Sequence, residues 1–480
     1  MVRKSSSVIA MLLLALGLAS CTGARVDKHD VASGTTKTTL SAGDQKTGDT
    51  TTTAGSADAL GGVKNPATLP KMPSKATTAT TLVAADTSPV RSTLFHPNED
   101  TVGITKDSIT LCAHAALTYG AAFHTSAADL NVFWSAINDA GGIYGRKVTV
   151  TYENDNYSPD TAVQAANACK QKGIFALLGG IGFDQIPAVR NWAEANRMLY
   201  IHHTATTQGT ANQHFSFTAL PSTEKMGEMF AELVATRFKG KKVGIIERNS
   251  PNWSPGVAAF KALAKQYGIQ VVADDPVNEN QGSYQQELLD MSNHGAQVVW
   301  IWENALASTQ IVKQSKAQQY SPQFLLFPFN LTSQTLGNDA MNPPLVGVAM
   351  YPAYSYQDYS GPFAGYASDM KDFEAEYAKY RPNADLKGLA GDLLFLNWTG
   401  MKGLAVMLQK CGPNCTRNKM VDIMTSFKSP PPFPASCAVD FTRPGFPRMG
   451  GFAVNVMQTY NAPSGNINWR NTNTCVEHLL

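Results

Sequence analysis

The sequence predicts an α/β fold made of two doubly wound lobes, each built on a parallel sheet. Strand-like and helix-like segments begin to alternate after Pro97, and the same alternation starts again after Pro221. Hydrophobic residues make up 43% of the 480-residue chain and charged residues only 16%, which leaves enough apolar material for two cores. We therefore expect two lobes in one chain, each with helices on both faces of its sheet.

The first run of alternation predicts lobe 1. Short apolar segments indicate strands, and the longer segments between them indicate helices. Gly141 and Gly142 are expected to end the first helix, because glycine is favoured just after a helix C-terminus. The expected strands are 109–115, 147–153, 174–178 and 198–202, and the expected helices are 126–139, 160–171 and 184–196.

The second run predicts lobe 2, and a C-terminal part follows it. The expected helices are 224–238, 255–267, 284–293 and 305–316, and the expected strands are 242–246, 269–273, 297–302 and 324–327. The C-terminal part is expected to hold long helices at 363–380 and 391–409 and a strand near 451–459. We assign 98–221 plus about 351–445 to lobe 1 and 222–350 plus about 446–480 to lobe 2, with three crossings near 221, 350 and 445.

The N-terminus carries the signs of a secretory signal peptide over residues 1–20. Arg3 and Lys4 precede an apolar run, 8–19, that is too short to span a bilayer as a helix. The run ends in Leu18-Ala19-Ser20-Cys21, which resembles a bacterial lipobox; a plain secretory signal with a chance cysteine is the alternative. A diacylglyceryl group on Cys21 would anchor the protein at the extracytoplasmic face of a bacterial membrane.

Residues 21–97 are expected to form the lipidated cysteine and a disordered tether. The segment is rich in Thr, Ser, Ala and Gly, and Phe95 is its first aromatic residue. Such a composition buries too little apolar area to offset the entropy lost on ordering. The tether would let the folded part move at a distance from the membrane.

Six cysteines follow Cys21, and an extracytoplasmic location makes disulfides the expected state. Six cysteines allow 15 sets of pairings, which the sequence does not decide. The pairs we favour are Cys112–Cys169, Cys411–Cys415 and Cys437–Cys475. A metal site at Cys411-Gly-Pro-Asn-Cys415 would need a second pair of ligands at suitable spacing, which the sequence lacks, so we expect no metal and no cofactor.

Composition and motifs argue against two other classes of protein. Lys and Arg number 39 and Asp and Glu number 37, a formal net charge of +2, which gives no basic face for binding nucleic acid. The sequence contains no Gly-x-Ser-x-Gly elbow, phosphate-binding Gly-x-x-x-x-Gly-Lys-Ser/Thr loop or His-Glu-x-x-His helix. We therefore do not expect an enzyme or a nucleic-acid-binding protein.

Five segments in order carry a family resemblance. They are Ile137-Asn-Asp-Ala-Gly-Gly-Ile-Tyr-Gly-Arg-Lys147, Glu153-Asn-Asp-Asn-Tyr-Ser-Pro159, Phe175-Ala-Leu-Leu-Gly-Gly180, His203-Thr-Ala-Thr206 and Lys241-Lys-Val-Gly-Ile-Ile246. Together they resemble class I periplasmic binding proteins of the leucine/isoleucine/valine-binding type, over residues from about 100 to 480. The resemblance implies a receptor that closes two lobes on a solute and delivers it to the permease of an ABC importer.

In open parallel sheets, ligands bind beyond the carboxyl ends of the strands. In lobe 1 this edge carries glycines, whose backbone N–H groups can face an anion, and threonine hydroxyls. The resemblance implies that the loops after the third and fourth strands hold the carboxylate and ammonium of an amino-acid ligand. At the end of the fourth strand we expect His203 to bind ligand and His202 to pack. The candidate ligand residues of lobe 1 are Thr118, Tyr119, Gly180, Gly182, Phe183, His203, Thr204, Ala205 and Thr206.

The same argument places candidate ligand residues in lobe 2 at Asn252, Trp253, Glu303, Asn304 and Phe329. Trp253 is expected to close over the ligand. Many amino-acid binders of the family carry a carboxylate where this chain has Phe329, so the group that would hold an ammonium is missing there. Glu303 is either its replacement or a solvated loop charge, and an amide, a urea or an aromatic acid is an alternative ligand.

The predicted function is therefore that of a monomeric, lipid-anchored receptor for a small polar solute, such as an amino acid or a related amide or carboxylate. Its partners would be the solute, an ABC importer permease and the membrane. The alternative is a ligand-sensing lipoprotein that signals through a separate membrane partner without transport.

Overall fold

The computed structural model describes residues 84–119, 123–179, 185–202, 213–278, 281–328, 330–351, 353–354, 364–427, 437, 439–443 and 448–477. All of them belong to the larger of the chain's two compact units, Leu60–Leu480. The predicted signal peptide, Cys21 and most of the predicted tether lie outside the described residues.

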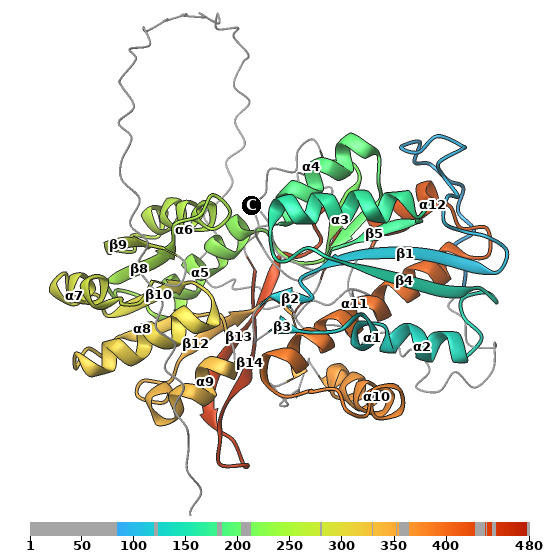
Figure 1. The fold of residues 1–480 in the computed structure, drawn as a ribbon. Helices are drawn as coiled ribbons and strands as arrows, with labels where there is room; N and C mark the ends of the chain where they lie inside the picture. The colour runs from blue at the N-terminus through green and yellow to red at the C-terminus, as the bar shows by residue number, and fades with distance from the viewer. Residues whose placement is uncertain are drawn as a thin grey trace, which may run out of the picture. The chain divides into compact units, whose positions relative to one another are not determined.

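Lobe 1 contains a five-stranded sheet in which every neighbouring pair is parallel, in the order β4-β1-β5-β6-β7. Helices cover both faces, with α3 and α4 on one and α2 and α11 on the other (Figure 1). The strands are β1 (Ser108–Ala115), β4 (Lys147–Asn154), β5 (Ala176–Leu178), β6 (Tyr200–His202) and β7 (Ser216–Thr218). The helices are α1 (Ala127–Leu130), α2 (Val132–Asp139), α3 (Pro159–Gln171), α4 (Ile186–Asn196) and, from the C-terminal part, α11 (Gly388–Cys411).

The helix predicted over 126–139 is two helices, broken at Asn131. Ser126 caps the first of them, because its hydroxyl accepts from the backbone N–H of Asp129 while the Asp129 carboxylate accepts from the Ser126 backbone N–H. Gly142 ends the second at a φ of +73°, where a Cβ would lie 2.0 Å from the carbonyl oxygen of Arg146. Only glycine fits this turn into β4.

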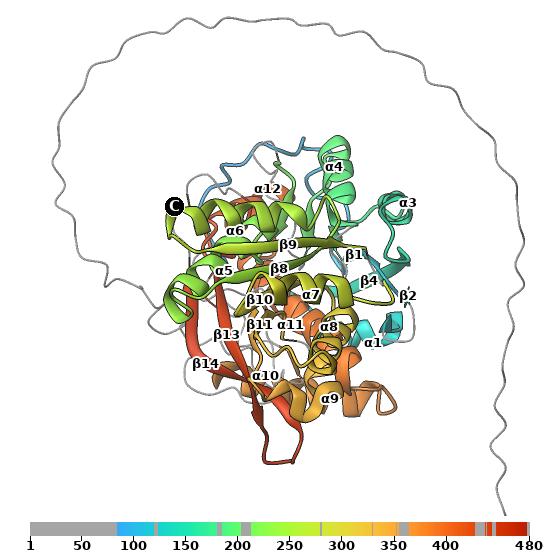
Figure 2. The same ribbon diagram turned by 90° about the vertical axis from the view of Figure 1, so that its left-hand side faces the viewer.

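Lobe 2 contains a seven-stranded sheet in the order β14-β13-β12-β11-β10-β8-β9 (Figure 2). Five strands are parallel: β8 (Val243–Arg248), β9 (Val271–Val277), β10 (Val298–Trp302), β11 (Gln323–Leu326) and β12 (Val346–Ala349). The other two, β13 (Ala453–Asn461) and β14 (Ile467–Glu477), are antiparallel. The parallel sheet predicted for this lobe is confirmed over β8 to β12. The antiparallel strands β13 and β14 extend it at one edge, since a turn as short as the one at Gly465 can join only antiparallel strands.

Helices pack on both faces of the parallel part of this sheet. The α5–α6 face buries Phe230 and Phe260 against Trp300, and the α7–α8 face buries Leu288 and Ile311. The helices are α5 (Thr223–Arg237), α6 (Ser254–Gln266), α7 (Gln285–Asn293), α8 (Ala305–Ala317) and α9 (Asn330–Leu336), followed by the 3₁₀ turn Gly337–Ala340.

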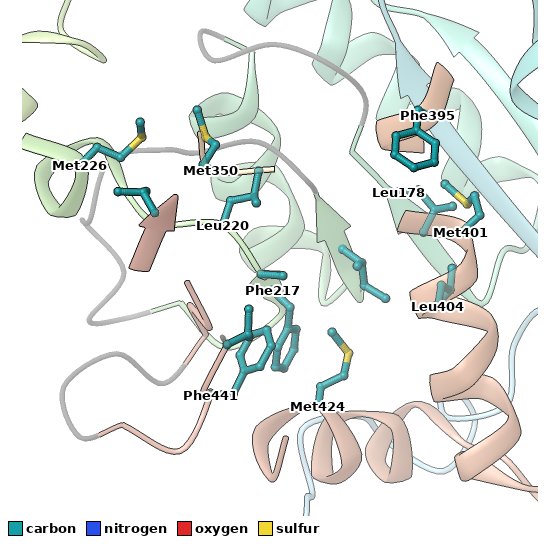
Figure 3. Packing of buried hydrophobic residues seen from close by; sticks show 14 of the residues in the cluster. Leu178, Phe217, Leu220, Met226, Met350, Phe395, Met401, Leu404, Met424 and Phe441 are labelled. Atoms are coloured by element: carbon teal, nitrogen blue, oxygen red, sulfur yellow. The ribbon is translucent and has the colours of Figure 1, made fainter. Parts of the chain in front are cut away.

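The described crossing segments run beside one another. Thr218 and Met449 form a parallel bridge, in which the Thr218 N–H donates to Arg448 at 3.0 Å and the Gly450 N–H donates to Thr218 at 2.9 Å. A Cβ at Gly451 would lie 2.4 Å from the backbone nitrogen of Pro221. Buried side chains near these crossings, including Phe217, Leu220, Met226, Met350 and Phe441, belong to one hydrophobic cluster with the lobe 1 core (Figure 3).

The C-terminal part adds the predicted long helices, α10 (Ala364–Tyr380) and α11, and an unpredicted helix, α12 (Arg417–Thr425). Another unpredicted element is the small hairpin of β2 (Thr118–Tyr119) and β3 (Phe123–His124). The folded part begins earlier than expected, since Phe95 is buried and its N–H donates to the Asn418 side chain at 3.0 Å.

Three disulfides join the pairs favoured from the sequence. Cys112–Cys169 ties β1 to α3, Cys411–Cys415 closes the end of α11, and Cys437–Cys475 ties a segment near the third crossing to β14. Within the described ranges, the structure holds no group of three side chains suited to a metal ion. Within the same ranges, no helix is long and apolar enough to cross a bilayer.

Candidate functional site

At the carboxyl edge of the lobe 1 sheet, Thr118 is the one predicted ligand residue whose side chain the structure describes. Its hydroxyl donates to Asn156 Oδ1 at 2.8 Å and accepts from Asn154 Nδ2 at 2.6 Å. Tyr119 is described as backbone only, within β2. The other predicted residues of this lobe lie outside the described residues: Gly180, Gly182, Phe183, His203, Thr204, Ala205 and Thr206.

Three side chains that the sequence analysis did not select form a buried network at this edge. His114, on β1, lies 2.7 Å through Nδ1 from Asp155 Oδ2 and 2.7 Å through Nε2 from the Tyr200 hydroxyl. All three residues are fully buried. Burial and the nearby Asp155 raise the pKa of Tyr200 well above its usual value, so its hydroxyl keeps its proton and can donate to His114.

His202 lies next to this network. Its ring stacks on Tyr200 with centroids 5.1 Å apart, and it is buried, as the predicted packing role requires. Gly179 on the adjacent segment leaves room for it, because a Cβ there would lie 2.3 Å from His202 Cβ. The packing of His202 therefore explains why a glycine stands directly after β5 in this chain.

At the carboxyl edge of the lobe 2 sheet, Trp253 stands just before α6 and is buried. Its ring makes edge contacts with Trp302, at 5.3 Å between centroids, and with Phe327, at 6.2 Å. The indole N–H of Trp302 donates to the carbonyl oxygen of Trp253 at 2.8 Å. Trp253 is therefore part of an aromatic cluster built from the ends of β10 and β11.

Glu303 is not the solvated loop charge that was one of its two predicted roles. It is fully buried and accepts from Arg248 Nε at 3.2 Å and Arg248 Nη2 at 3.0 Å, and its Oε2 also accepts from the Asn304 N–H at 2.7 Å. The Arg248 guanidinium in turn lies 4.8 Å from the centroid of the Trp253 ring. Arg248, which the sequence analysis missed, thus joins two of the predicted residues into one cluster.

The remaining predicted residues of lobe 2 have local roles. The Asn304 side chain accepts from the Ala307 N–H at 3.0 Å and caps α8. The Asn252 N–H donates to Ser250 Oγ at 3.3 Å in the loop before α6. Phe329 lies outside the described residues.

A second carboxyl group stands on β8. Glu247 is 8% exposed, and its Oε2 has no hydrogen-bond partner among the residues that the structure describes. Burial raises its pKa, while Lys261 and Ser254 act in the opposite direction. Unlike Glu303, it keeps an oxygen that bonds no other described residue.

Two signals in the sequence could have found the missed residues. His114 is a histidine within the apolar stretch Leu111–Ala115, and Arg248 is a cation two residues after the apolar run Val243–Ile246. A polar group at such a position needs a partner, because burying it without one costs free energy. The partners lie 41, 86 and 55 residues away, so no local pattern identifies them.

Comparisons with known proteins identify the family and the fold of the chain. The family described as periplasmic binding protein matches residues 119–448. The Leu/Ile/Val-binding protein homolog 3 of Brucella melitensis is 29% identical over 185 residues, which cover 36% of this chain and 49% of that protein. The chain therefore spans about half the length of the curated relatives it matches.

Solved structures share the fold at low identity. A branched-chain amino acid ABC transporter protein from Thermus thermophilus with bound valine has a TM-score of 0.61 at 14% identity, covering 78% of this chain and 98% of that one. A solute-binding protein of Rhodopseudomonas palustris in complex with 3,4-dihydroxybenzoic acid has a TM-score of 0.61 at 15% identity, with the same coverage. With the family pattern matched over most of the folded part, the chain belongs to the periplasmic binding protein family.

Proposed function

We propose that this protein is an extracytoplasmic receptor that captures a small solute between its two lobes and delivers it to the permease of an ABC importer. The observation that carries the proposal is the pair of α/β sheets, one parallel and one mainly parallel, joined by adjacent crossing segments at Thr218 and Met449. A solute that contacts both lobes stabilises the closed arrangement by its differential affinity for it. A permease can then distinguish the loaded receptor by its shape.

In lobe 1 we propose that Thr118, Tyr119 and the loops containing Gly180–Phe183 and His203–Thr206 bind the carboxylate of the solute. In lobe 2 we propose that Asn252, Trp253 and Phe329 contact its body. Glu303 and Asn304 would support the solute site indirectly. The Glu303 side chain already holds Arg248, and the Asn304 side chain already caps the start of α8.

We favour a carboxylic acid without an ammonium group as the solute. Both Glu303 oxygens accept hydrogen bonds from Arg248, and one also accepts from Asn304, so Glu303 is poorly placed to take an ammonium. The cluster of Trp253, Trp302 and Phe327 suits an aromatic or aliphatic body. One structural neighbour contains an aromatic acid and another contains valine, so the fold accommodates both classes.

The test is a thermal-shift screen of the purified full-length chain with its disulfides intact, followed by small-angle X-ray scattering. Solutes are supplied in pairs that differ by the ammonium alone, such as leucine with 4-methylpentanoate and phenylalanine with 3-phenylpropanoate. A solute at a hundred times its dissociation constant adds about 2.7 kcal/mol of stability, and closure lowers the radius of gyration. We expect the acid of a pair to bind at least tenfold more tightly than the amino acid.

Two results would change the proposal in different ways. Tighter binding of the amino acid, lost in Glu247→Gln but kept in Asp107→Asn, would replace the proposed solute class and make Glu247 the ammonium acceptor. Binding without any fall in the radius of gyration, or no binding by a broad panel that adds amides, ureas, polyamines and sugars, would contradict capture by closure and favour a sensor or scaffold.

We also propose that Cys21 carries the lipid that holds the receptor at the membrane. The wild-type chain made in a bacterial host should then sediment with membranes and gain the mass of the lipid at its new N-terminus. Cys21→Ala should leave the same folded protein in the soluble extracytoplasmic fraction. Equal fractionation of the two chains would contradict lipid anchoring.

A further inference from the structure

The network of His114, Asp155 and Tyr200 has no role in the function proposed so far. Its members come from β1, from the start of the loop after β4, and from β6. Each is fully buried, and the two hydrogen bonds that join them are both 2.7 Å. Such a network is stable only while every member is satisfied, because an apolar core has no replacement for a lost partner.

Asp155 connects this network to the backbone that leads into α3. Its Oδ1 accepts from the Tyr157 N–H at 2.9 Å, and its carbonyl accepts from the Ser158 N–H at 2.9 Å. Its own N–H donates to the carbonyl of Ala115 at 2.9 Å. Asp155, through its backbone and its carboxylate together, therefore holds the ends of β1 and β4 relative to each other and sets the conformation of 155–158.

Two more contacts extend the network to the neighbouring elements. Gln185, the residue before α4, is fully buried and donates through Nε2 to Asp155 Oδ2 at 3.4 Å. Tyr200 stacks on His202, the last residue of β6. The starts of α3 and α4 and the ends of β1, β4 and β6 are thus attached to one buried set of side chains.

We propose that His114 and Tyr200 are positioning residues for the lobe 1 half of the solute site. The inference rests on the proposed function, because predicted solute residues lie within three residues of the end of β1, of the end of β6 or of Gln185 in the sequence. The network touches no solute itself. It holds the described segments 114–118, 155–158, 185–187 and 200–202 in register, so that groups on several strand ends meet one ligand with little loss of entropy.

The experiment compares Tyr200→Phe with a matched variant, Tyr152→Phe, by hydrogen–deuterium exchange of the ligand-free full chain. Both changes delete one phenolic hydroxyl in lobe 1, but the Tyr152 hydroxyl donates to Leu130 at 3.1 Å on another part of the lobe. We expect Tyr200→Phe to raise exchange at least tenfold in peptides covering 114–118, 155–158 and 185–187. Peptides from the lobe 2 strands 243–248 and 298–302 should exchange as in the wild type.

The second measurement is affinity, taken well below the unfolding temperature of both variants. Valine, 4-methylpentanoate and 3,4-dihydroxybenzoate are the probes, and the probe that the wild type binds most tightly is used. Tyr200→Phe should raise its dissociation constant at least fivefold, whereas Tyr152→Phe should leave it within twofold. Asp155→Asn, which keeps the shape but removes the charge, should repeat the effect of Tyr200→Phe.

The outcomes separate this inference from the proposed function. Exchange that rises equally in both variants, or uniformly over both lobes, would overturn the positioning role whatever the affinity. Local exchange with an unchanged dissociation constant would also overturn it, because the network would then be structural only. If the wild type binds neither these probes nor any solute of the broad panel, and the local exchange is still seen, the linkage of the segments stands while the proposed function fails.

Discussion

At the carboxyl edge of lobe 1 the buried polar groups are joined by hydrogen bonds, whereas at the edge of lobe 2 they form an ion pair beside an aromatic ring. There His114 joins the Asp155 carboxylate, through Nδ1, to the Tyr200 hydroxyl, through Nε2. In lobe 2 the Glu303 carboxylate faces the Arg248 guanidinium over Trp253. The difference is that the lobe 1 network spreads its hydrogen bonds over several side chains and the backbone, whereas the two buried opposite charges of lobe 2 depend mainly on each other.

The largest effect is expected when the lobe 2 pair is broken. Glu303→Gln removes the negative charge that faces the buried Arg248 guanidinium, and removing one partner of such a pair costs about 3–5 kcal/mol. The midpoint of urea unfolding, followed by tryptophan fluorescence, measures the loss. The exposed pair Lys106–Asp107, at 2.6 Å, offers the control Asp107→Asn, which should change stability little.

A double variant sharpens this prediction. Replacing both partners, as Arg248→Met with Glu303→Leu, removes the charges together and should be less destabilising than Glu303→Gln alone. A double variant that is less stable than the single one would show that the pair contributes net stability, and the contrast between the two edges would then have to be withdrawn.

The second effect concerns a partly buried carboxyl group that belongs neither to the lobe 1 network nor to the lobe 2 ion pair. Glu376, on α10, accepts from Trp398 Nε1 at 2.6 Å, and burial raises its pKa to about 7 from 4.5. The native state therefore holds a proton that the unfolded state releases between these values, so stability is full below pH 4.5 and falls as the pH rises through about 7. The loss is on the order of 2–3 kcal/mol.

Glu376→Gln isolates this contribution. The variant keeps an acceptor for Trp398 but cannot titrate, so its unfolding free energy should vary less with pH than that of the wild type. At pH 8 the variant should be the more stable of the two, and at pH 4 the two should agree. Parallel pH profiles would assign the wild-type slope to other groups, such as Asp275, whose pKa burial raises to about 6.

The third effect is expected from the lobe 1 network. Tyr200→Phe removes a donor and leaves His114 Nε2 buried without its partner, which should cost about 1–3 kcal/mol. Tyr152→Phe, with a weaker hydrogen bond on a partly buried group, should cost less. Equal losses measured by urea unfolding would mean that the network behaves like any single hydrogen bond.

Much of the fold followed from periodicity and helix signals, because these are local. The expected strand 109–115 is β1, and the expected helix 305–316 is α8. The structure adds β12, only four residues long, and β14, whose Asn-rich sequence Ile-Asn-Trp-Arg-Asn-Thr-Asn-Thr has low strand propensity. Both pair with β13, which lies between them in the sheet.

The candidate site was less accessible to prediction. Strand order placed Trp253 and Glu303 at one edge, but nothing in the sequence shows that Glu303 is already bonded to Arg248, 55 residues away. For the same reason the pairing of His114 with Asp155 and Tyr200 was missed. Sequence patterns locate the ends of strands, whereas the partners of a buried charge are a property of the assembled sheet.

The smallest stability effect is expected at Thr118, which the structure places at the exposed rim of lobe 1. Its hydroxyl bonds Asn154 and Asn156 at the surface, so Thr118→Val should change the unfolding free energy by less than about 0.5 kcal/mol.

If Thr118 binds solute as proposed, the same variant should weaken binding of the captured solute about tenfold, because an apolar group replaces a donor beside a polar ligand. Calorimetric titration of the wild type and the variant at one temperature measures this ratio. A loss of affinity without a loss of stability would distinguish a residue at the rim that contacts solute from Tyr200, where both should change together. Unchanged affinity would leave Thr118 as a turn residue held by its two asparagines, and the solute-binding half of lobe 1 would then rest on the loops beyond β5 and β6.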